Sequence, residues 1–360
     1  MEYVNLDKLV WFQEGPGVRN YQYVDKGIKL INVTNLVNGK LKLHLTNRFI
    51  SEEEANGKYK HFMCDIGDLV IASSGITYDT LDKKIAFVTE KDLPLCMNTS
   101  VIRFKPLDNN VCLDFIYYFL KSKKYKNQIS KLMTGSAQLN YGPSHLHKVK
   151  IPLYSFDKQL KIAKELKKID STILICHNNL ENLDNIVKSQ FIEMFGDCKE
   201  CTKITNLVEI KDNLRKPINS EERMNMQNGV LYPYYGATGQ VGFINEYLSN
   251  FDGLCIAEDC GNYKAGEESS YIVKGKVWVN NHAHLLKCKD NCNLYYLNEF
   301  FRYIDLTGYV NGATRQKLTQ SKLKEIKVLN PPIEQQNQFA SFVEQIDKSK
   351  YFGGDGYGIC

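Results

Sequence analysis

Few residue groups in this sequence have the types and the spacing that bond chemistry requires. The segment Asn330-Pro331-Pro332-Ile333 places an amide before two prolines, as in enzymes that orient a base amine for methyl transfer. Such a site needs an aromatic ring at the fourth position to stack on the extruded base, and Ile333 cannot stack. The sequence also has no glycine-rich turn between a strand and a helix to hold a methyl donor. We therefore expect no catalytic residue.

Metal chemistry is not expected either. Cys198 and Cys201 have the spacing of zinc ligands, and Cys288 and Cys292 could add two more. However, the second pair has a wider separation, and the two pairs lie in different predicted elements. We interpret the pattern as a chance arrangement. Because no Ser-His-acid or P-loop pattern occurs, the sequence favours binding over catalysis.

The composition is typical of a globular cytoplasmic protein. No uninterrupted apolar run reaches the ~18 residues of a membrane span, so we expect no membrane association. The first residues, MEYVNLDKLVWF, lack the basic and then apolar pattern of a signal peptide. The eleven cysteines are spread thinly over the chain, which favours free thiols in a reducing compartment.

Positive charge is concentrated in two short runs, although the net charge is only +5. One run contains no acid, and the other contains only Glu325. A single run of this kind is usually a solvated helix face. The two runs lie at matching places in an internal repeat, which favours an anionic partner. They comprise Lys121, Lys123, Lys124, Lys126 and Lys131, and then Arg315, Lys317, Lys322, Lys324 and Lys327.

The chain repeats itself with a shift of 177 positions and no gap, from 135–170 to 312–347. The order of features is the same in both segments: a glycine, a basic polar stretch, a short apolar strand, a turn and an amphipathic helix. Leu69–Ala72 (LVIA) and Leu254–Ala257 (LCIA) match as buried strands upstream. Residues that match across the shift include Leu146 with Leu323, Lys150 with Lys327, Gln159 with Gln336 and Ala163 with Ala340.

A long helix follows the first copy. Apolar residues alternate at steps of three and four, which is the heptad spacing of a coiled-coil seam. No proline or glycine interrupts the segment from Asp157 to Gly196, and about 38 residues at 1.5 Å each form a rod of roughly 57 Å. Such a rod is expected to separate two bodies, although a long core helix of one large domain is the alternative. The seam includes Leu166, Ile169, Ile173, Leu180, Leu183 and Val187.

The predicted fold is mixed α+β, with two pseudo-repeated α/β domains separated by long coiled-coil helices. Short β-branched and aromatic runs alternate with glycine and asparagine turns in each half. We expect a first domain at 1–156, the heptad helix at 157–197 and a second domain at 198–332. A shortened second helix is expected at 333–350. The glycine-rich end, YFGGDGYGIC, is expected to form an irregular tail at 351–360 because glycine disfavours helix.

This arrangement resembles the specificity subunit of type I restriction-modification systems, whose two domains are target-recognition domains. FIEMFGD (Phe191–Asp197) resembles the end of the family's central conserved region. In the second half, the segments at 232–261 (YPYYGATGQVGFINEYLSNFDGLCIAEDCG) and 278–288 (WVNNHAHLLKC) resemble one class of target-recognition domain. GATRQKL (Gly312–Leu318) and LNPPIEQQ (Leu329–Gln336) extend the resemblance. The first half departs from it, because its turn reads PLYSFDKQ without a double proline.

The resemblance implies a non-catalytic DNA-recognition subunit that reads a bipartite, asymmetric double-stranded DNA target. It directs adenine methylation or restriction by its partners: modification (methyltransferase) subunits, expected to be two, and restriction or translocase subunits. S-adenosylmethionine, Mg²⁺ and ATP would be bound by those partners and no cofactor by this chain. The alternative is a stand-alone DNA-binding or scaffold protein, or a truncated specificity subunit.

We expect DNA contacts from two kinds of residue. Basic side chains neutralise phosphates, and side chains with paired donors and acceptors read base edges. The structural alternative for each polar residue is a turn or sheet position that satisfies nearby backbone groups. In the first domain the candidates are Ser73, Ser74, Thr77, Tyr78, Asn98, Ser100, Lys121, Lys123 and Lys124; in the second they are Asn262, Tyr263, Lys264, Asn280, Asn281, His282, His284, Arg315 and Lys317.

Overall fold

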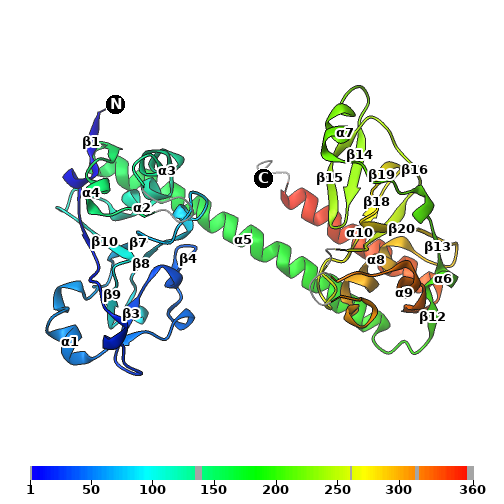
Figure 1. Ribbon diagram of the computed structural model, residues 1–360, viewed down its shortest axis with the longest axis horizontal. Coiled ribbons are helices and arrows are strands. Elements are labelled where there is room, and N and C mark those ends of the chain that lie inside the picture. The colour runs from blue at the N-terminus through cyan, green and yellow to red at the C-terminus, as the bar shows by residue number, and fades with distance from the viewer. Residues whose placement is uncertain (1, 134–139, 260–261, 313–315, 355–360) are drawn as a thin grey trace. The chain divides into compact units, whose positions relative to one another are not determined.

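The structure, a computed structural model, describes residues 2–133, 140–259, 262–312 and 316–354. The chain divides into two compact units, Met1–Ile173 and Leu174–Cys360, here called unit 1 and unit 2. A 40-residue helix, α5 (Phe156–Phe195), begins in unit 1 and ends in unit 2 (Figure 1). Each unit has its own sheets and its own hydrophobic core.

Unit 1 is built on a four-stranded antiparallel sheet in the order β2-β10-β7-β8. Its strands are β2 (Val10–Glu14), β7 (Leu69–Ala72), β8 (Ile85–Phe87) and β10 (Val101–Pro106). All four residues of β7 are buried apolar side chains, as expected of a strand covered on both faces. Side chains from α2 (Leu113–Lys121), α3 (Lys123–Ser130) and α4 (Pro143–Leu146) join the same core.

A smaller sheet in unit 1 has the order β6-β3-β9, in which β3 and β9 run parallel. Its strands are β3 (Ile28–Ile31), β6 (Phe49–Ile50) and β9 (Leu95–Met97). The first strand, β1 (Tyr3–Asn5), pairs with β11 (Lys150–Pro152) immediately before α5. The remaining short elements are β4 (Leu36–Val37), β5 (Lys40–Leu41) and α1 (Glu52–Asn56).

Unit 2 repeats this plan. Its main sheet is antiparallel in the order β13-β20-β17-β18, and its second sheet, β15-β14-β19-β16, contains the parallel pair β14 and β19. The main strands are β13 (Val208–Ile210), β17 (Gly253–Ala257), β18 (Ser270–Val273) and β20 (Ala283–Cys288). The second sheet contains β14 (Tyr232–Gly236), β15 (Gly239–Ile244), β16 (Ser249–Asn250) and β19 (Lys276–Val279).

The outer elements of unit 2 also match those of unit 1. β12 (Cys201–Lys203) pairs with β21 (Lys327–Leu329) as β1 pairs with β11, so the matched residues Lys150 and Lys327 each begin the strand before a long helix. The helices are α6 (Ile204–Leu207), α7 (Ser220–Asn225), α8 (Leu294–Tyr303), α9 (Gln320–Glu325) and α10 (Ile333–Gly354). The predicted internal repeat and mixed fold class are therefore confirmed.

A buried glutamine ties each long helix to its own unit. Gln159 accepts a hydrogen bond from the Cys112 backbone N–H at 3.0 Å and donates to the Tyr154 carbonyl oxygen at 2.9 Å. Gln336 accepts from the Asn293 N–H at 2.9 Å and donates to the Pro331 carbonyl oxygen at 2.9 Å. These side chains are 2% and 0% exposed. Because Cys112 and Asn293 precede α2 and α8, each glutamine fixes a long helix against the start of another helix.

The end of α5 packs into unit 2, where α10 runs antiparallel to it (Figure 1). The ring of Phe339 lies 5.5 Å from the rings of both Phe191 and Phe195. Further along α10, Lys350 Nζ lies 2.9 Å from Asp184 Oδ1, so higher numbers on α10 face lower numbers on α5. The second helix thus pairs with the first, and it continues to Gly354, four residues beyond the predicted end at Lys350. Residues 355–360 of the predicted tail lie outside the described residues.

Candidate nucleic-acid interface

In each unit, the ends of two equivalent neighbouring strands bring polar loops together. In unit 2, Ala257 at the end of β17 pairs with Ala283 at the start of β20. The turn before β20 reaches the second sheet, because the Asn280 N–H donates to the Tyr235 carbonyl oxygen at 3.0 Å. In unit 1, Ala72 pairs with Val101, and the Asn98 N–H donates to the Ile31 carbonyl oxygen at 3.0 Å.

We call these two loop clusters edge 1 and edge 2. Edge 1 consists of Ser73, Ser74 and Asn98–Ser100. Edge 2 consists of Glu258, Asp259, Asn280–His282 and Lys317. Each cluster lies where the two sheets of its unit adjoin, so rigid strands position the loops from two sides.

Edge 2 presents side chains suited to polar recognition. The Asn280 side chain is 9% exposed, and its oxygen accepts the His282 backbone N–H at 2.8 Å, so Asn280 holds the turn. The turn presents Asn281, which is exposed, and His282, whose side chain is 44% exposed. Lys317 is half exposed, with Nζ 3.0 Å from Glu258 Oε1. An amide, an imidazole and an ammonium group therefore lie together at the surface.

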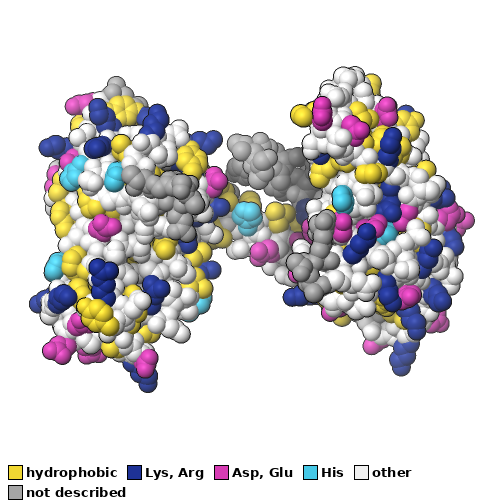
Figure 2. All heavy atoms as spheres, in the orientation of Figure 1, with side chains coloured by type: hydrophobic (Ala, Val, Ile, Leu, Met, Phe, Trp, Pro, Cys, Tyr) yellow, Lys and Arg dark blue, Asp and Glu magenta, His cyan; other side chains and the backbone are white. Residues whose placement is uncertain are grey.

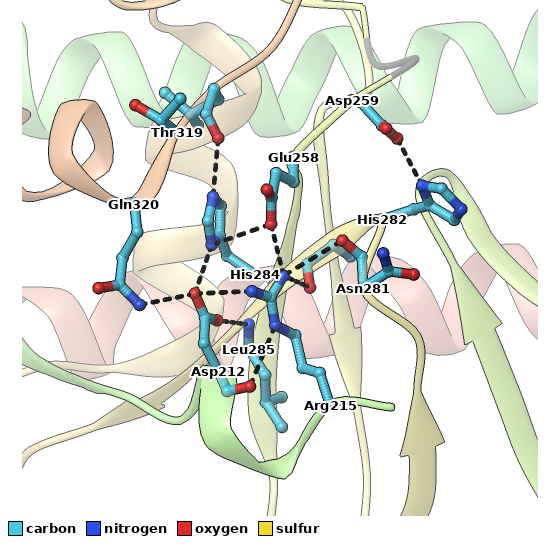
Figure 3. Close-up of polar contacts among 12 residues, drawn as sticks. Asp212, Arg215, Glu258, Asp259, Asn281, His282, His284, Leu285, Thr319 and Gln320 are labelled. Carbon is cyan, nitrogen blue, oxygen red and sulfur yellow. Dashed lines mark hydrogen bonds and ion pairs between the residues drawn. The ribbon is translucent and has the colours of Figure 1, made fainter. Parts of the chain in front are cut away.

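The orientation of His282 is set by a carboxylate. Its Nδ1 lies 2.8 Å from Asp259 Oδ1 (Figure 3). An ionised carboxylate only accepts hydrogen bonds, so Nδ1 carries the proton. In the neutral ring, Nε2 is then an acceptor, which suits the exocyclic amine of adenine or cytosine.

A buried ionic network lies beneath edge 2 (Figure 3). Arg215 contacts Asp212 Oδ2 at 3.0 Å and Glu258 Oε2 at 2.7 Å, and it donates to the Ala283 carbonyl oxygen at 2.8 Å. His284 is fully buried, with Nδ1 2.7 Å from Asp212 Oδ2 and Nε2 2.8 Å from the carbonyl oxygen of Leu318. Both ring nitrogens of His284 therefore face hydrogen-bond acceptors inside the network.

The network keeps both carboxylates ionised. Burial alone would raise the pKa of Asp212, but hydrogen bonding to His284, the charge of His284, and contacts with Gln320 and Arg215 hold that pKa below its ordinary value. Burial likewise opposes ionisation of Glu258, and hydrogen bonds from Arg215 and Lys317 outweigh it and lower the pKa. Through charge-assisted hydrogen bonds, the network thus fixes two parts of unit 2. These are the start of β20 and the segment that contains Lys317.

Edge 1 is more neutral in character. The Ser73 hydroxyl is buried and donates to Glu14 Oε1 at 3.3 Å, and burial raises the pKa of that carboxyl group. Asn98 is 7% exposed, and its side-chain oxygen accepts the Thr99 N–H at 2.8 Å. Ser100 Oγ accepts the Val33 N–H at 3.3 Å. These residues support the edge, while Thr99 is exposed and Ser74 half-buried.

Two further first-unit candidates, Thr77 and Tyr78, lie on the loop that follows Ser74 of edge 1 in the chain. Thr77 is exposed, and its N–H donates to Thr80 Oγ1 at 2.9 Å. The Tyr78 hydroxyl donates to Asn127 Oδ1 at 2.7 Å, which connects this loop to α3. The loop is thus held by hydrogen bonds while its surface remains accessible.

The predicted lysines differ in their surroundings. Lys121 Nζ lies 3.1 Å from Asp170 on α5, so it stabilises unit 1 internally, whereas Lys123 is exposed. Lys124 contacts the hydroxyl group of Tyr3 and lies over its ring at 4.4 Å. It lines an open cleft of about 350 Å³ together with Tyr3, Asn127, Gln128, Lys131 and Lys150. This cleft collects positive charge in unit 1.

Several second-unit candidates are structural in this fold. His284 and Tyr263 are 0% and 1% exposed, so neither presents its side chain to a ligand; the Tyr263 hydroxyl donates to the Ala257 carbonyl oxygen at 3.2 Å. We therefore correct the expectation that these two residues contact DNA directly. Asn262 and Lys264 are exposed. Arg315 lies outside the described residues.

The predicted seam residues are covered to different extents. Val187 is 2% exposed in the core of unit 2, and Leu166 and Leu183 are half-buried. Ile169, Ile173 and Leu180 are 52%, 49% and 41% exposed. The seam thus contributes to the core at Val187 and leaves apolar side chains at the surface elsewhere on α5.

Basic side chains are scattered over both units on the face shown in Figure 2, with acidic side chains between them. In the described part of the chain, no three His, Cys, Asp or Glu side chains are grouped as metal ligands. Nor does any helix there combine the length and apolar character needed to cross a membrane.

Sequence reasoning missed the ionic network. Glu258 directly follows the buried LCIA strand, and that position was an available signal. Asp212, Arg215 and Gln320 carry no local signal, because they lie up to 108 positions apart and meet only in the fold. The β14–β15 hairpin beside edge 2 was also missed as a source of candidate residues.

Comparison with known proteins agrees with this architecture. The profile of the family described as "Type I restriction modification DNA specificity domain" matches residues 20–185 and again 199–351. The type I restriction enzyme MjaVIII specificity subunit of Methanocaldococcus jannaschii is 29% identical over 189 residues, which are 52% of this chain and 43% of that protein. The type I restriction enzyme EcoprrI specificity subunit of Escherichia coli is 23% identical over 124 residues, 34% of this chain and 29% of that protein. The aligned parts span less than half the length of these curated relatives.

Solved structures share the fold over a greater length. The S subunit of a type I restriction-modification system from M. genitalium has a TM-score of 0.61 and 16% identity, with 99% of this chain and 91% of that chain covered. A chain from a structure of a type I R-M system, concerned with complex assembly and conformational transition, has a TM-score of 0.52 and 13% identity. That match covers 97% of this chain and 90% of the other. At these identities the likeness concerns the fold.

Proposed function

Because this chain belongs to the family of type I restriction modification DNA specificity domains, we propose that it is the DNA-recognition subunit of a type I restriction-modification complex. It directs methylation or restriction by partner subunits and catalyses neither reaction itself. The observation that carries this proposal is the duplicated architecture: each unit uses equivalent strand ends to support a polar edge. Such a complex acts in the cytoplasm.

The target is a bipartite DNA sequence. Edge 1 presents hydroxyl groups from Ser74 and Thr99, whereas edge 2 presents Asn281, His282 and Lys317. Different side chains in equivalent positions select different bases, so the two half-sites differ in sequence. A spacer that neither unit contacts separates them, and the continuous helix α5 sets its length.

Recognition at edge 2 combines base contacts with phosphate contacts. The amide of Asn281 offers a donor and an acceptor that match the N6 and N7 atoms of adenine. His282, oriented by Asp259, offers a single ring nitrogen beside it. Lys317 and the exposed Lys264 supply positive charge for the backbone. In unit 1, the cleft that contains Lys124, Lys131 and Lys150 provides the corresponding charge.

The partner subunits supply the chemistry. Two methyltransferase subunits bind the exposed apolar positions of α5, such as Ile169, Ile173 and Leu180, and carry S-adenosylmethionine. Restriction subunits that use ATP and Mg²⁺ join them. These exposed apolar side chains recur at the seam spacing of one helix, which supports the docking proposal, because apolar patches rather than single apolar side chains mark interaction surfaces.

Methylation-sensitive genome sequencing of the host, with and without the gene, tests the function. The expected result is a gapped, asymmetric methylated motif that disappears on deletion and returns with the wild-type gene. Loss of a continuous motif, or no loss, contradicts the proposal. Co-purification of a methyltransferase with the chain is the second expected result, whereas DNA binding without it indicates a stand-alone protein.

A further inference from the structure

The tip of the β14–β15 hairpin lies beside edge 2. β14 runs parallel to β19, with Tyr235 opposite Val279, so the end of β14 reaches the turn that follows β19. A Cβ atom added to Gly236 would lie 3.6 Å from Asn280 Nδ2, which places the tip next to the Asn280 side chain. The tip thus adjoins the turn that presents Asn281 and His282.

The tip is held in a defined position. The Tyr271 hydroxyl donates to the carbonyl oxygen of Gly236, and the rings of Tyr235 and Tyr271 stack with centroids 5.6 Å apart. Gly239 has φ +127°, a conformation that favours glycine. A fixed hairpin loses little conformational entropy on binding, which suits it to positioning a contact residue.

A β-bulge directs the side chains just after the tip. Tyr235 pairs with Gln240 and Tyr234 pairs with Gly242, so Val241 is the extra residue. A bulge increases the local twist and changes the direction of nearby side chains, and bulges are common beside functional sites. Thr238 and Gln240 are both exposed. The Gln240 amide nitrogen donates to the Gly242 carbonyl oxygen at 3.4 Å, a long contact that a ligand can replace.

The repeat provides independent support. In unit 1, the chain leaves β3 and enters the segment Asn32–Asn35, and the Val33 N–H donates to Ser100 Oγ of edge 1 at 3.3 Å. Thr34, in this segment, is exposed. The segment after the parallel strand of the smaller sheet therefore adjoins the edge in both units, although the two segments differ in sequence and in local structure.

We propose that Gln240 is a specificity-determining residue that reads one base pair in the half-site of unit 2, with Thr238 beside it. This inference rests on the proposed function. The glutamine amide donates and accepts in one plane, which matches the N6 and N7 atoms of adenine in the major groove. The base pair read by Gln240 is adjacent to those read by edge 2, because the hairpin tip adjoins the Asn280–His282 turn.

The test compares methylation motifs of full-length variants produced together with their native partner subunits. Gln240→Ala is expected to relax one position of one half-site and leave the other half-site unchanged, with discrimination at that position reduced about tenfold or more. Gln240→Glu is expected to shift the preference toward cytosine, because a carboxylate accepts from the cytosine amine. Asn250→Ala is the matched control: it removes an exposed amide opposite Lys276, at the far end of β19 from the turn.

The outcomes separate this inference from the proposed function. If wild-type protein gives a gapped motif and both Gln240 variants give that same motif with unchanged stringency, the assignment of Gln240 is wrong while the function stands. Equal relaxation by Asn250→Ala also overturns the assignment, since the effect would then be general. If wild-type protein gives no gapped motif, the proposed function itself fails.

Discussion

Gln336 provides the sharpest test of how the repeat is stabilised. The side chain is fully buried, and it makes two hydrogen bonds of 2.9 Å to backbone groups at Asn293 and Pro331. A third contact, from Nε2 to the Asn291 carbonyl oxygen, is at 3.5 Å and contributes little. Gln336→Ala removes the amide, leaves its partners unsatisfied and opens a small cavity. Each unsatisfied buried group costs about 1–3 kcal/mol, so the expected loss is about 2–4 kcal/mol for unit 2.

The assay is urea unfolding of the full chain, with hydrogen exchange at the Asn293 amide as a local readout. With an m-value of about 2–3 kcal/mol per molar urea, a loss of about 3 kcal/mol lowers the midpoint of the unit 2 transition by about 1–1.5 M. The matched control is Gln338→Ala, because Gln338 lies on the same helix and is exposed. Its effect is expected to stay within about 0.5 kcal/mol.

The equivalent residue of unit 1 makes the reasoning refutable in a second way. Gln159→Ala is expected to destabilise the unit 1 transition by a similar amount and to leave unit 2 unchanged, because its bonds lie within unit 1. If Gln336→Ala and Gln338→Ala unfold at the same urea concentration, the buried amide does not stabilise the fold as the geometry indicates. If either Gln159→Ala or Gln336→Ala shifts both unfolding transitions equally, the two buried glutamines do not stabilise their units independently.

Three further predictions concern charge and length. The pKa values of Asp212 and Glu258 lie below their ordinary values of 3.8 and 4.5, so their stabilising effect is present above these values and is lost as pH falls through the lower, folded-state values. Asp212→Asn should therefore lower the free energy of unfolding by about 3–5 kcal/mol at pH 7 and make that free energy fall less steeply as the pH is lowered. The measurement is denaturant unfolding from pH 7 to pH 3, with the exposed Asp290→Asn as the control. An unchanged dependence of the unfolding free energy on pH would contradict this prediction. Lys123→Ala should weaken DNA binding equally for target and non-target duplexes and reduce the slope of log K against log salt by about one, whereas a sequence-dependent loss in the binding titration would show that Lys123 reads bases. Inserting one heptad into α5 should lengthen the helix by about 10.5 Å and the unread spacer by about three base pairs in the methylated motif, and an unchanged spacer would show that α5 does not set it.

The sequence predicted those features that depend on local periodicity or on matched positions. The alternation of apolar residues identified α5, and the shift that matched Gln159 with Gln336 also matched their hydrogen-bonding roles. The roles of His282 and His284 could not be separated in this way, because His282 directly precedes strand β20 and His284 is the second residue of that strand. Only the fold shows that His284 faces the Asp212–Arg215 pair while His282 faces the surface. Similarly, the glycine-rich end suggested that α10 stops at Lys350, but the helix continues to Gly354.

The division between buried and exposed residues has a consequence for specificity. Asn98 and Asn280 occupy equivalent turns, both are nearly buried, and both donate a backbone N–H to the neighbouring parallel strand. Because these residues hold the turns, the exposed positions beside them can change without loss of the fold: Thr99 follows Asn98, and Asn281 follows Asn280. A substitution at Asn281 is therefore expected to alter base preference at little cost in stability, whereas a substitution at Asn280 disturbs the turn. Two units with the same framework and different exposed residues provide a physical basis for two half-sites that are unlike in sequence.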